Sequence, residues 1–227
     1  MENIKVKVCG IKKENDVKMC MDLGVDVLGF VVEYPIPVPW NLNRKEATPL
    51  LKALKPPHKS CIVTGGEPEK VIELATILKP SIIQLHYRET LKDTTIIANT
   101  LKKQGIEVIK TVPPVAEERI FQFGTEDIER IVKSLCETNI YGLLADSRVP
   151  SNAFGGGLEL DIKFCMQVMS LSTKPVITAG GINPDNVCDF IKKTGTKFID
   201  VMTGVEKSPG EKDKEMLSRL LSLVHNI

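Results

Sequence analysis

The sequence lacks the features that mark nucleic-acid-binding and membrane proteins. Its 30 basic and 29 acidic residues leave a net charge of +1, whereas a nucleic-acid-binding surface usually carries a clear basic excess. Aromatic residues make up only 5% of the chain, which leaves few platforms for base stacking. No apolar run reaches the ~18 residues that a membrane span requires, and no basic region followed by an apolar stretch marks a secretory signal at the N-terminus. We therefore expect a cytoplasmic protein that binds neither nucleic acid nor membranes.

Metal-ligating patterns are also missing from the sequence. The three histidines lie far apart, at His58, His86 and His225, and none of the six cysteines forms a C-x-x-C pair. Most of the cysteines stand in apolar periodic segments, which is typical of buried, reduced thiols in a cytosolic protein. The sequence therefore predicts no metal site.

Short β-branched apolar runs alternate with longer helical patterns from one end of the chain to the other. Eight runs predict strands: Ile4–Val8, Val27–Val32, Ser60–Val63, Ser81–Leu85, Val108–Val112, Tyr141–Ala145, Pro175–Thr178 and Phe198–Val201. Strands that alternate with helices form a parallel sheet, and their nearly continuous apolar character fits burial on both faces. An open doubly wound sheet usually has about five or six strands, so eight favour a closed barrel. Because no linker divides the chain, we predict an α/β fold with a single (β/α)8-barrel domain over residues 1–227.

Two helix boundaries can be predicted from local signals. Asn183-Pro184 has the sequence of a helix N-cap followed by proline at the first helical position. Apolar residues at helical spacing predict a last helix over about Lys212–His225.

Glycines follow two of the predicted strands, at the end of the barrel where such proteins carry their function. Gly180-Gly181 comes after the seventh strand, and Thr203-Gly204 comes after the eighth. Glycine lets backbone N–H groups approach an anion closely, and loops seven and eight form the usual phosphate site of these barrels. The glycines could instead merely make tight turns. Their placement after both strands favours a phosphate site and hence a small phosphorylated substrate.

Cys9 and Asp146 are the candidate acid–base pair, because they end the first and sixth predicted strands. A nearby cation or backbone amides could turn the thiol into a thiolate base. Burial in the barrel mouth would raise the pKa of Asp146 and make it a proton donor. Taken singly, Cys9 could be a small core residue, and Asp146 could be a helix N-cap or a partner of Arg148. Together they could approach a substrate from opposite sides of the pocket.

Several short motifs follow one another in order from about residue 5 to residue 224. They are Val6–Ile11, Gly24–Phe30, Gln84–His86, Asp146-Ser147, Ala179–Val187, Asp200–Glu206, Ser208–Gly210 and Lys212-Asp213. Together these motifs resemble those of the phosphoribosylanthranilate isomerase family of tryptophan biosynthesis. The combination of Cys9-Gly10-Ile11 with the two late glycine motifs is specific for this family among barrels.

The resemblance implies an Amadori rearrangement of an aminated phosphosugar, carried out without a cofactor. It assigns Asp146 as the general acid that protonates the furanose ring oxygen and opens the ring to a Schiff base. It assigns Cys9 as the general base that removes the proton from C2. The residues that it implies for binding the substrate or its phosphate are Gly180, Gly181, Ile182, Thr203, Gly204, Asp200, His86 and Arg148. The expected partner is a small phosphorylated sugar-amine, and the protein is expected to be a monomer or a homodimer.

The sequence departs from the family on one side of the expected substrate. The family usually has an arginine in the loop after the second strand, where it binds the anthranilate carboxylate, but residues 34–40 contain no cation. Tyr87 replaces a usual glycine, and Phe154–Leu158 lacks a usual lysine. Arg44, Arg88 or Arg148 could compensate. The proline-rich loop with Trp40, which we expect to be exposed, could form a lid or a contact surface.

Three functional interpretations fit these features. The first is phosphoribosylanthranilate isomerase activity. The second is a related isomerase with the same acid–base pair and a more apolar aglycone, accommodated by Val38, Trp40 and Tyr87. The third is a non-catalytic barrel that binds a phosphorylated metabolite, and the presence of both Cys9 and Asp146 counts against it.

Overall fold

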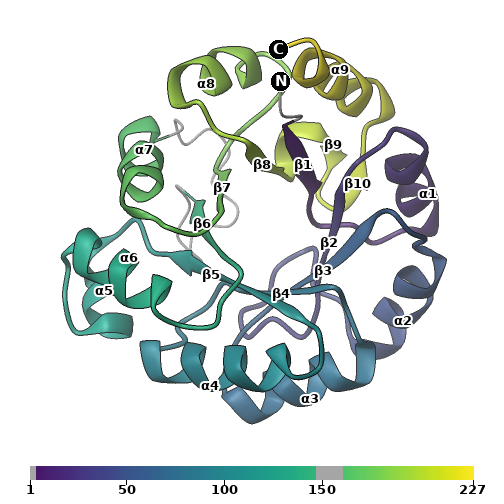
Figure 1. Ribbon diagram of the computed structural model, residues 1–227. Helices are drawn as coiled ribbons and strands as arrows, with labels where there is room; N and C mark the ends of the chain where they lie inside the picture. The colour runs from purple at the N-terminus through teal and green to yellow at the C-terminus, as the bar shows by residue number, and fades with distance from the viewer. Residues whose placement is uncertain (1–3, 147–160) are drawn as a thin grey trace.

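The strands form one closed, parallel barrel, seen end-on in Figure 1. The computed structural model describes residues 4–146 and 161–227. The barrel strands are β1 (Lys5–Val8), β2 (Val27–Val31), β3 (Lys59–Thr64), β4 (Ile82–Leu85), β5 (Glu107–Val112), β6 (Gly142–Asp146), β7 (Val176–Ala179) and β8 (Phe198–Val201). β1 pairs with β8 in a register that sets Lys7 opposite Asp200, so the first and last strands close the ring. The predicted barrel is confirmed, and each predicted strand boundary lies within one residue of the observed one.

Helices surround the ring of strands (Figure 1). They are α1 (Glu14–Asp22), α2 (Arg44–Ala53), α3 (Pro68–Leu78), α4 (Leu91–Lys102), α5 (Ala116–Phe123), α6 (Ile128–Cys136), α7 (Ile162–Leu171), α8 (Val187–Thr194) and α9 (Lys214–His225). After β8 come a short 3-10 helix, η2 (Thr203–Val205), and an antiparallel hairpin of β9 (Glu206–Ser208) and β10 (Glu211–Lys212). Within the described part of the chain, no helix combines the length and the apolar character that crossing a membrane requires.

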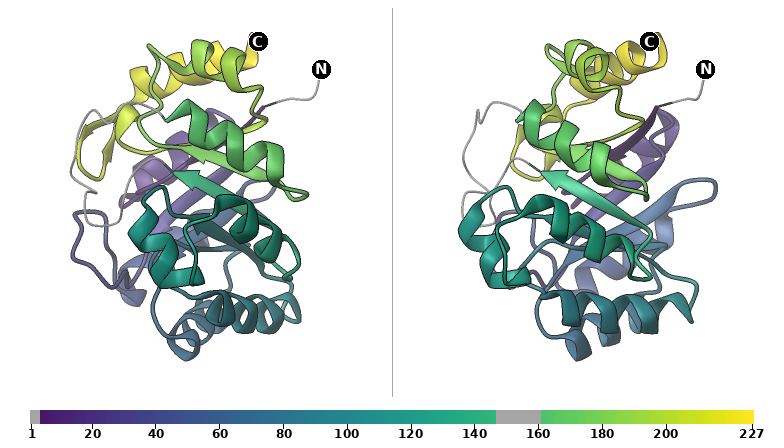
Figure 2. Two further views of the ribbon diagram at one scale, coloured as in Figure 1. Left: turned by 90° about the vertical axis from the view of Figure 1, so that its left-hand side faces the viewer. Right: turned by 60° about the vertical axis from the view of Figure 1, so that its left-hand side comes forward.

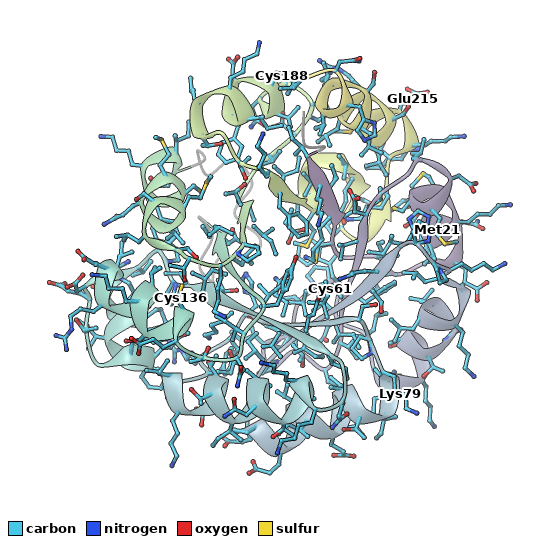
Figure 3. All side chains as sticks on the ribbon, viewed as in Figure 1. Met21, Cys61, Lys79, Cys136, Cys188 and Glu215 are labelled. Atoms are coloured by element: carbon cyan, nitrogen blue, oxygen red, sulfur yellow. The ribbon has the colours of Figure 1, made fainter. Side chains whose placement is uncertain are left out.

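Successive strand residues point alternately into the barrel and out toward the helices. An apolar cluster fills part of the interior: Val27, Cys61, Ile82, Ile109, Leu144, Ile177, Ala179 and Phe198. Residues of the opposite parity, such as Val6 and Ile83, belong to the larger core between strands and helices. Figure 3 shows Cys61 inside the ring of strands and Cys136 and Cys188 among the outer helices. This alternation explains why the strands are apolar along their whole length.

Polar side chains set where several helices begin. Asn43 caps α2 in a capping box with Glu46, and Asp213 caps α9 by accepting from two backbone N–H groups. The last helix starts two residues later than predicted, because Lys212 belongs to β10. The prediction that Asn183 caps a helix was wrong. Its side chain instead accepts from the backbone N–H of Asp185 (2.8 Å), and α8 begins one turn later, after Asn186.

The carboxyl ends of the parallel strands meet at one end of the barrel, which we call the mouth. In Figure 2 (left) the strand arrowheads point toward the end at which the β9–β10 hairpin and the loop between β2 and α2 lie. An isolated bridge between Val32 and Leu42 pins that loop to the end of β2. The strand-end residues of the sequence analysis therefore gather at this end of the molecule, as the fold requires.

Candidate active site

Cys9 lies at the mouth, one residue beyond the end of β1. The residue is only 5% exposed, and its backbone N–H donates to the carbonyl of Val201 on β8 (2.8 Å). Gly10 follows with φ +76°, a conformation that favours glycine and turns the chain away from the strand. On the neighbouring strand, a Cβ added to Gly29 would lie 2.9 Å from Cys9 Sγ. The glycine thus leaves the space that the thiol occupies.

A buried ion pair lies below Cys9 in the barrel. Lys7 lies on β1 and Cys9 follows it two positions later, just beyond the strand, so both side chains point to the same side, into the barrel. Lys7 Nζ lies 2.5 Å from Asp200 Oδ2, with the Lys7 side chain fully buried and that of Asp200 8% exposed. Burial raises the pKa of the Cys9 thiol, and the positive charge of Lys7 offsets part of that effect. A role for Asp200 in holding substrate stays a prediction.

Asp146 ends β6, and the residue is only 4% exposed. Its Oδ2 lies 3.2 Å from Nε2 of His86, which follows β4. The hydroxyl of Tyr34 donates to the backbone carbonyl of His86 (2.9 Å), and the two rings meet edge to face. His86, expected to bind substrate, therefore contacts the candidate acid and can orient it. Tyr34 in turn fixes the backbone of His86.

The two candidate catalytic groups stand on opposite walls of the mouth. β1 carries Cys9 and β6 carries Asp146, and β7 and β8 separate these strands along the shorter way round the ring. A substrate between the walls can meet an acid on one side and a base on the other. The strand positions are those expected from the sequence, and the roles of the two residues as base and acid stay predictions.

The two glycine loops of the predicted phosphate site lie against each other. Gly180 and Gly181 have φ values of +109° and +89°, which favour glycine. A Cβ added to Gly204 would lie 2.0 Å from the carbonyl oxygen of Ile182, so only glycine allows this approach of the two loops. Thr203 and Gly204 form the turn of η2. The backbone of both loops can thus face one anion, which is the geometry that a phosphate site needs.

Trp40 is buried, and the expectation that it is exposed was wrong. The residue is 2% exposed and packs in an apolar cluster with Cys9, Val31, Tyr34 and Val63. Its indole N–H donates to the carboxylate of Glu206 (3.0 Å), which also accepts from the ammonium of Lys212 (2.6 Å). The proline-rich loop is therefore attached to the β9–β10 hairpin at the mouth.

The cations that could replace the missing arginine are placed as follows. Arg44 pairs with Glu33 (2.8 Å) and Glu73 (2.7 Å), and Arg88 pairs with Glu118. Arg148, expected to bind substrate, lies outside the described residues, as does the glycine-rich segment 154–158. Another cation stands closer to Cys9 in the chain.

The ammonium of Lys12 donates to the carbonyl of Pro39 (2.7 Å) in the proline-rich loop. A Cβ on Gly210 of the hairpin would lie 2.8 Å from Lys12 Cδ and 4.0 Å from Trp40 Cδ1, so Lys12 and Trp40 stand together. Trp40 in turn contacts the Gly10 turn beside Cys9, since a Cβ on Gly10 would lie 2.7 Å from Trp40 Cδ1. Lys12 is therefore a cation at the base side of the mouth.

Sequence reasoning missed Lys7, Lys12 and Tyr34. A lysine inside an otherwise apolar strand was the available signal for Lys7, since such a charge needs a buried partner. For Tyr34 and Lys12 the signal is weak, because their partners come from distant loops. In the described ranges, no three His, Cys, Asp or Glu side chains are grouped so as to hold a metal ion.

Comparison with known proteins identifies relatives along nearly the whole chain. A family model described as "N-(5'phosphoribosyl)anthranilate (PRA) isomerase" matches residues 6–222. The N-(5'-phosphoribosyl)anthranilate isomerase of Methanocaldococcus jannaschii is 29% identical over 232 residues, which cover 99% of this chain and 98% of that protein. The protein of the same name from Natronomonas pharaonis is 28% identical over 215 residues, 94% of each chain.

Solved structures show the same relationship. The phosphoribosyl anthranilate isomerase of Thermotoga maritima is similar with a TM-score of 0.80 and 27% identity, over 99% of this chain and 100% of that one. A phosphoribosyl anthranilate isomerase in complex with reduced 1-(o-carboxyphenylamino)-1-deoxyribulose 5-phosphate has a TM-score of 0.77 and 25% identity, over the same shares. The match of the family model over residues 6–222 shows that this chain belongs to the N-(5'-phosphoribosyl)anthranilate isomerase family.

Proposed function

We propose that this chain catalyses the isomerisation of N-(5'-phosphoribosyl)anthranilate to the 1-deoxyribulose 5-phosphate derivative, a step of tryptophan biosynthesis. The observation that carries the proposal is the placement of Cys9 and Asp146 on opposite walls of the mouth, in a chain that matches the family from residue 6 to 222. The same placement argues against a barrel that only binds a metabolite, because binding alone does not need an acid facing a base.

Asp146 is the proposed general acid. Its proton goes to the furanose ring oxygen, the bond from that oxygen to C1 breaks, and the nitrogen lone pair forms the C1–N double bond. His86, 3.2 Å away, holds the carboxyl group in place. Once the iminium has formed, the proton on C2 is acidic enough for Cys9 to remove. The electron pair left at C2 then forms a C1–C2 double bond and neutralises the iminium, which gives an enolamine. This enol tautomerises to the 1-deoxyribulose product as C1 gains a proton and the C2 hydroxyl loses one.

The glycine loops after β7 and β8 are the proposed phosphate site. Gly180, Gly181 and Ile182 supply one loop, and Thr203 and Gly204 supply the other. Their contact through Gly204 and the carbonyl of Ile182 supports a single anion pocket between them. Binding the phosphate there positions the sugar between the acid and the base, which is worth much of the rate in a reaction without a cofactor.

Lys12 is the proposed cation for the anthranilate carboxylate. Arg44 and Arg88 already hold carboxylates of the protein, whereas the ammonium of Lys12 donates to a carbonyl oxygen. It stands beside Trp40 on the side of the mouth that carries the base. An ammonium–carboxylate contact there would restore the charge-assisted hydrogen bond that the missing arginine supplies in the family.

The proposal is tested by steady-state isomerisation of freshly generated phosphoribosylanthranilate, followed by the loss of its fluorescence. We expect turnover by the wild-type protein and a loss of at least about 10³-fold in kcat for Cys9→Ala and for Asp146→Asn. Cys188→Ala, on the outer helix α8, is the matched control and keeps activity. A folded wild-type protein that does not turn over this substrate contradicts the proposal and favours the interpretation with another aglycone.

The remaining expectations concern the molecule as a whole. We propose that residues 1–227 form one domain and that the protein works in the cytoplasm, which the six free thiols support. One solved relative from Thermotoga maritima is described as a monomer generated from a dimeric protein. For this chain a monomer or a homodimer is proposed, and light scattering on the purified protein distinguishes the two.

A further inference from the structure

Three lysine–carboxylate pairs are buried within the described residues, and one of them, Lys212 with Glu206, ties the β9–β10 hairpin to Trp40. Lys110 Nζ lies 2.9 Å from Glu89 Oε2, and Lys7 Nζ lies 2.5 Å from Asp200 Oδ2; both lysine side chains are fully buried. Removing two charges from water is costly, so a buried pair needs a reason beyond stability. For the Lys110–Glu89 pair the reason is structural. Glu89 also accepts from the backbone N–H of Gly66 (3.0 Å), so it connects the loops that follow β3 and β4. The Lys7–Asp200 pair lies inside the barrel, beneath the proposed base.

The side chains of Lys7 and Cys9 are consecutive inward-pointing side chains at the end of β1, and both border the space beside Gly29. A Cβ added to Gly29 on β2 would meet both Cys9 Sγ at 2.9 Å and Lys7 Cε at 3.1 Å. The two side chains therefore flank the same point of the neighbouring strand. Since Lys7 and Asp200 are direct register partners across the β1–β8 seam, the carboxylate fixes the ammonium at this height in the barrel.

We propose that Lys7 is a positioning residue for the base, and that its buried ammonium, held by Asp200, stabilises the thiolate of Cys9 as it forms. The ion pair acts as an oriented dipole whose positive end faces the thiol. Such a charge, already in place in a site that excludes water, stabilises the thiolate without reorganisation during the reaction. The assignment deepens the proposed function and rests on it.

The groups that face Cys9 come from several elements. Lys7 on β1 and Lys212 on β10 favour the thiolate, whereas Asp200 on β8 and burial oppose it. The effect of Lys7 on the pKa of Cys9 comes next after burial and exceeds that of Asp200. Burial lowers the pKa of Lys7, but Asp200, together with the neighbouring thiols of Cys9 and Cys61, raises it above its ordinary range, so the lysine stays charged. The ammonium of Lys7 thus lowers the pKa of Cys9, and the carboxylate of Asp200 raises it.

The test removes the ammonium of Lys7 and measures the ionisation of Cys9. The ionisation of Cys9 is followed by ultraviolet thiolate absorbance against pH, as the difference between each protein and its Cys9→Ala counterpart. We expect Lys7→Met to raise the apparent pKa of Cys9 by about one unit or more, because it removes the positive charge that favours the thiolate. With phosphoribosylanthranilate, Lys7→Met is expected to lower kcat at neutral pH at least about tenfold, with KM within about threefold.

A purely structural pair predicts another pattern. Lys7→Met would then destabilise the protein and leave the pKa of Cys9 unchanged or lower, and either result overturns the proposal. Lys110→Met is the matched control: it breaks the buried pair with Glu89, costs comparable stability, and is expected to leave the Cys9 titration within about 0.3 pH units.

A third variant covers the case in which a lone buried charge prevents folding. Lys7→Met/Asp200→Leu removes both charges and replaces a buried pair by apolar residues, a change that proteins often tolerate. Because the effect of the ammonium outweighs that of the carboxylate, the Cys9 pKa is expected to rise, and a wild-type titration overturns the assignment. The titration needs no turnover, so it stays informative if the protein acts on a different substrate. Failure of the proposed function is seen separately, in the wild-type activity.

Discussion

Single glycines decide how closely the loops of the mouth approach one another. Gly204 has no positive φ, so its backbone conformation is open to other residues. Its importance is steric, because a Cβ there would lie 2.0 Å from the Ile182 carbonyl oxygen and 2.9 Å from Asn183 Cβ. Any larger residue must push apart the two loops that form the proposed phosphate site. A substitution at Gly204 is therefore expected to weaken substrate binding more than it destabilises the fold.

Gly204→Ala is therefore expected to raise KM for phosphoribosylanthranilate at least about tenfold and to weaken inhibition by inorganic phosphate, since both depend on the same anion site. Steady-state kinetics with phosphate as competitor measures both effects. Gly195→Ala is the control. Gly195 caps α8 with φ +68° and has no neighbour within 4 Å, so alanine there costs about 1 kcal/mol of stability and leaves KM unchanged. Equal KM values for the two variants would count against the phosphate assignment.

Lys12→Met tests recognition of the substrate carboxylate. Losing one charge-assisted contact costs roughly 1.5–3 kcal/mol, so we expect KM to rise about 10- to 100-fold with a smaller change in kcat. Lys13→Met is matched in sequence and charge, but Lys13 pairs with Glu211 in solvent and is 54% exposed. Its KM is expected to stay within about twofold of the wild type. If Lys12→Met also leaves KM unaltered, the carboxylate is bound elsewhere.

At this scale, the sequence could predict residues whose role depends on strand position. Cys9 and Asp146 became candidates because both end apolar runs, and a barrel places all such ends at one mouth; their catalytic roles stay predictions. The partner of Lys7 could not be found in this way, because Asp200 stands 193 positions away and meets it only when the barrel closes. Trp40 was misjudged for a related reason. Its loop has no apolar periodicity, and the side chain is buried by a hairpin that comes 166 positions later.

At the scale of elements, strands were predictable and the small connecting elements were not. A buried parallel strand is marked by its own apolar run, so each boundary fell within one residue. The strands of the β9–β10 hairpin have three and two residues, of which two are exposed, and such short strands leave no periodic signal. Its register depends instead on Glu206, which accepts from both Trp40 and Lys212. This hairpin holds the proline-rich loop against the mouth.

Glu206→Ala is expected to destabilise the protein by about 3–5 kcal/mol, because it leaves the buried ammonium of Lys212 without its carboxylate. Urea unfolding followed by circular dichroism measures the change. Glu129→Ala removes a carboxylate from an ion pair whose side chains are 64% and 55% exposed, and its effect is expected to stay within about 0.5 kcal/mol. A similarly small effect of Glu206→Ala would mean that the hairpin is held mainly by packing.

At the scale of the whole molecule, the barrel buries thiols in its separate layers. Cys61 lies inside the ring, Cys20 lies on α1, and Cys165 lies on α7, all fully buried. Burial raises the pKa of each to about 12. An unfolded chain ionises its thiols near pH 8.5. The folded protein therefore keeps protons that the unfolded chain has lost, and alkaline pH favours unfolding.

Because of this linkage, stability should fall with rising pH, and Cys20 and Cys165, which lie on helices outside the ring of strands, can report that fall. Their stabilising contribution is complete below about pH 8.5 and is lost as pH rises toward 12, at up to about 1.4 kcal/mol per pH unit for each thiol. Cys20→Ala/Cys165→Ala is thus expected to show a flatter decline of unfolding free energy between about pH 9 and 11, whatever its constant cost in packing. Partial burial raises the pKa of Cys136, but hydrogen bonds led by Ser172 bring it below its ordinary value, so Cys136→Ala should not flatten the curve. Urea unfolding across that range decides the matter: parallel curves for the double variant and the wild type would mean that the buried thiols ionise in the folded protein as easily as in the unfolded chain.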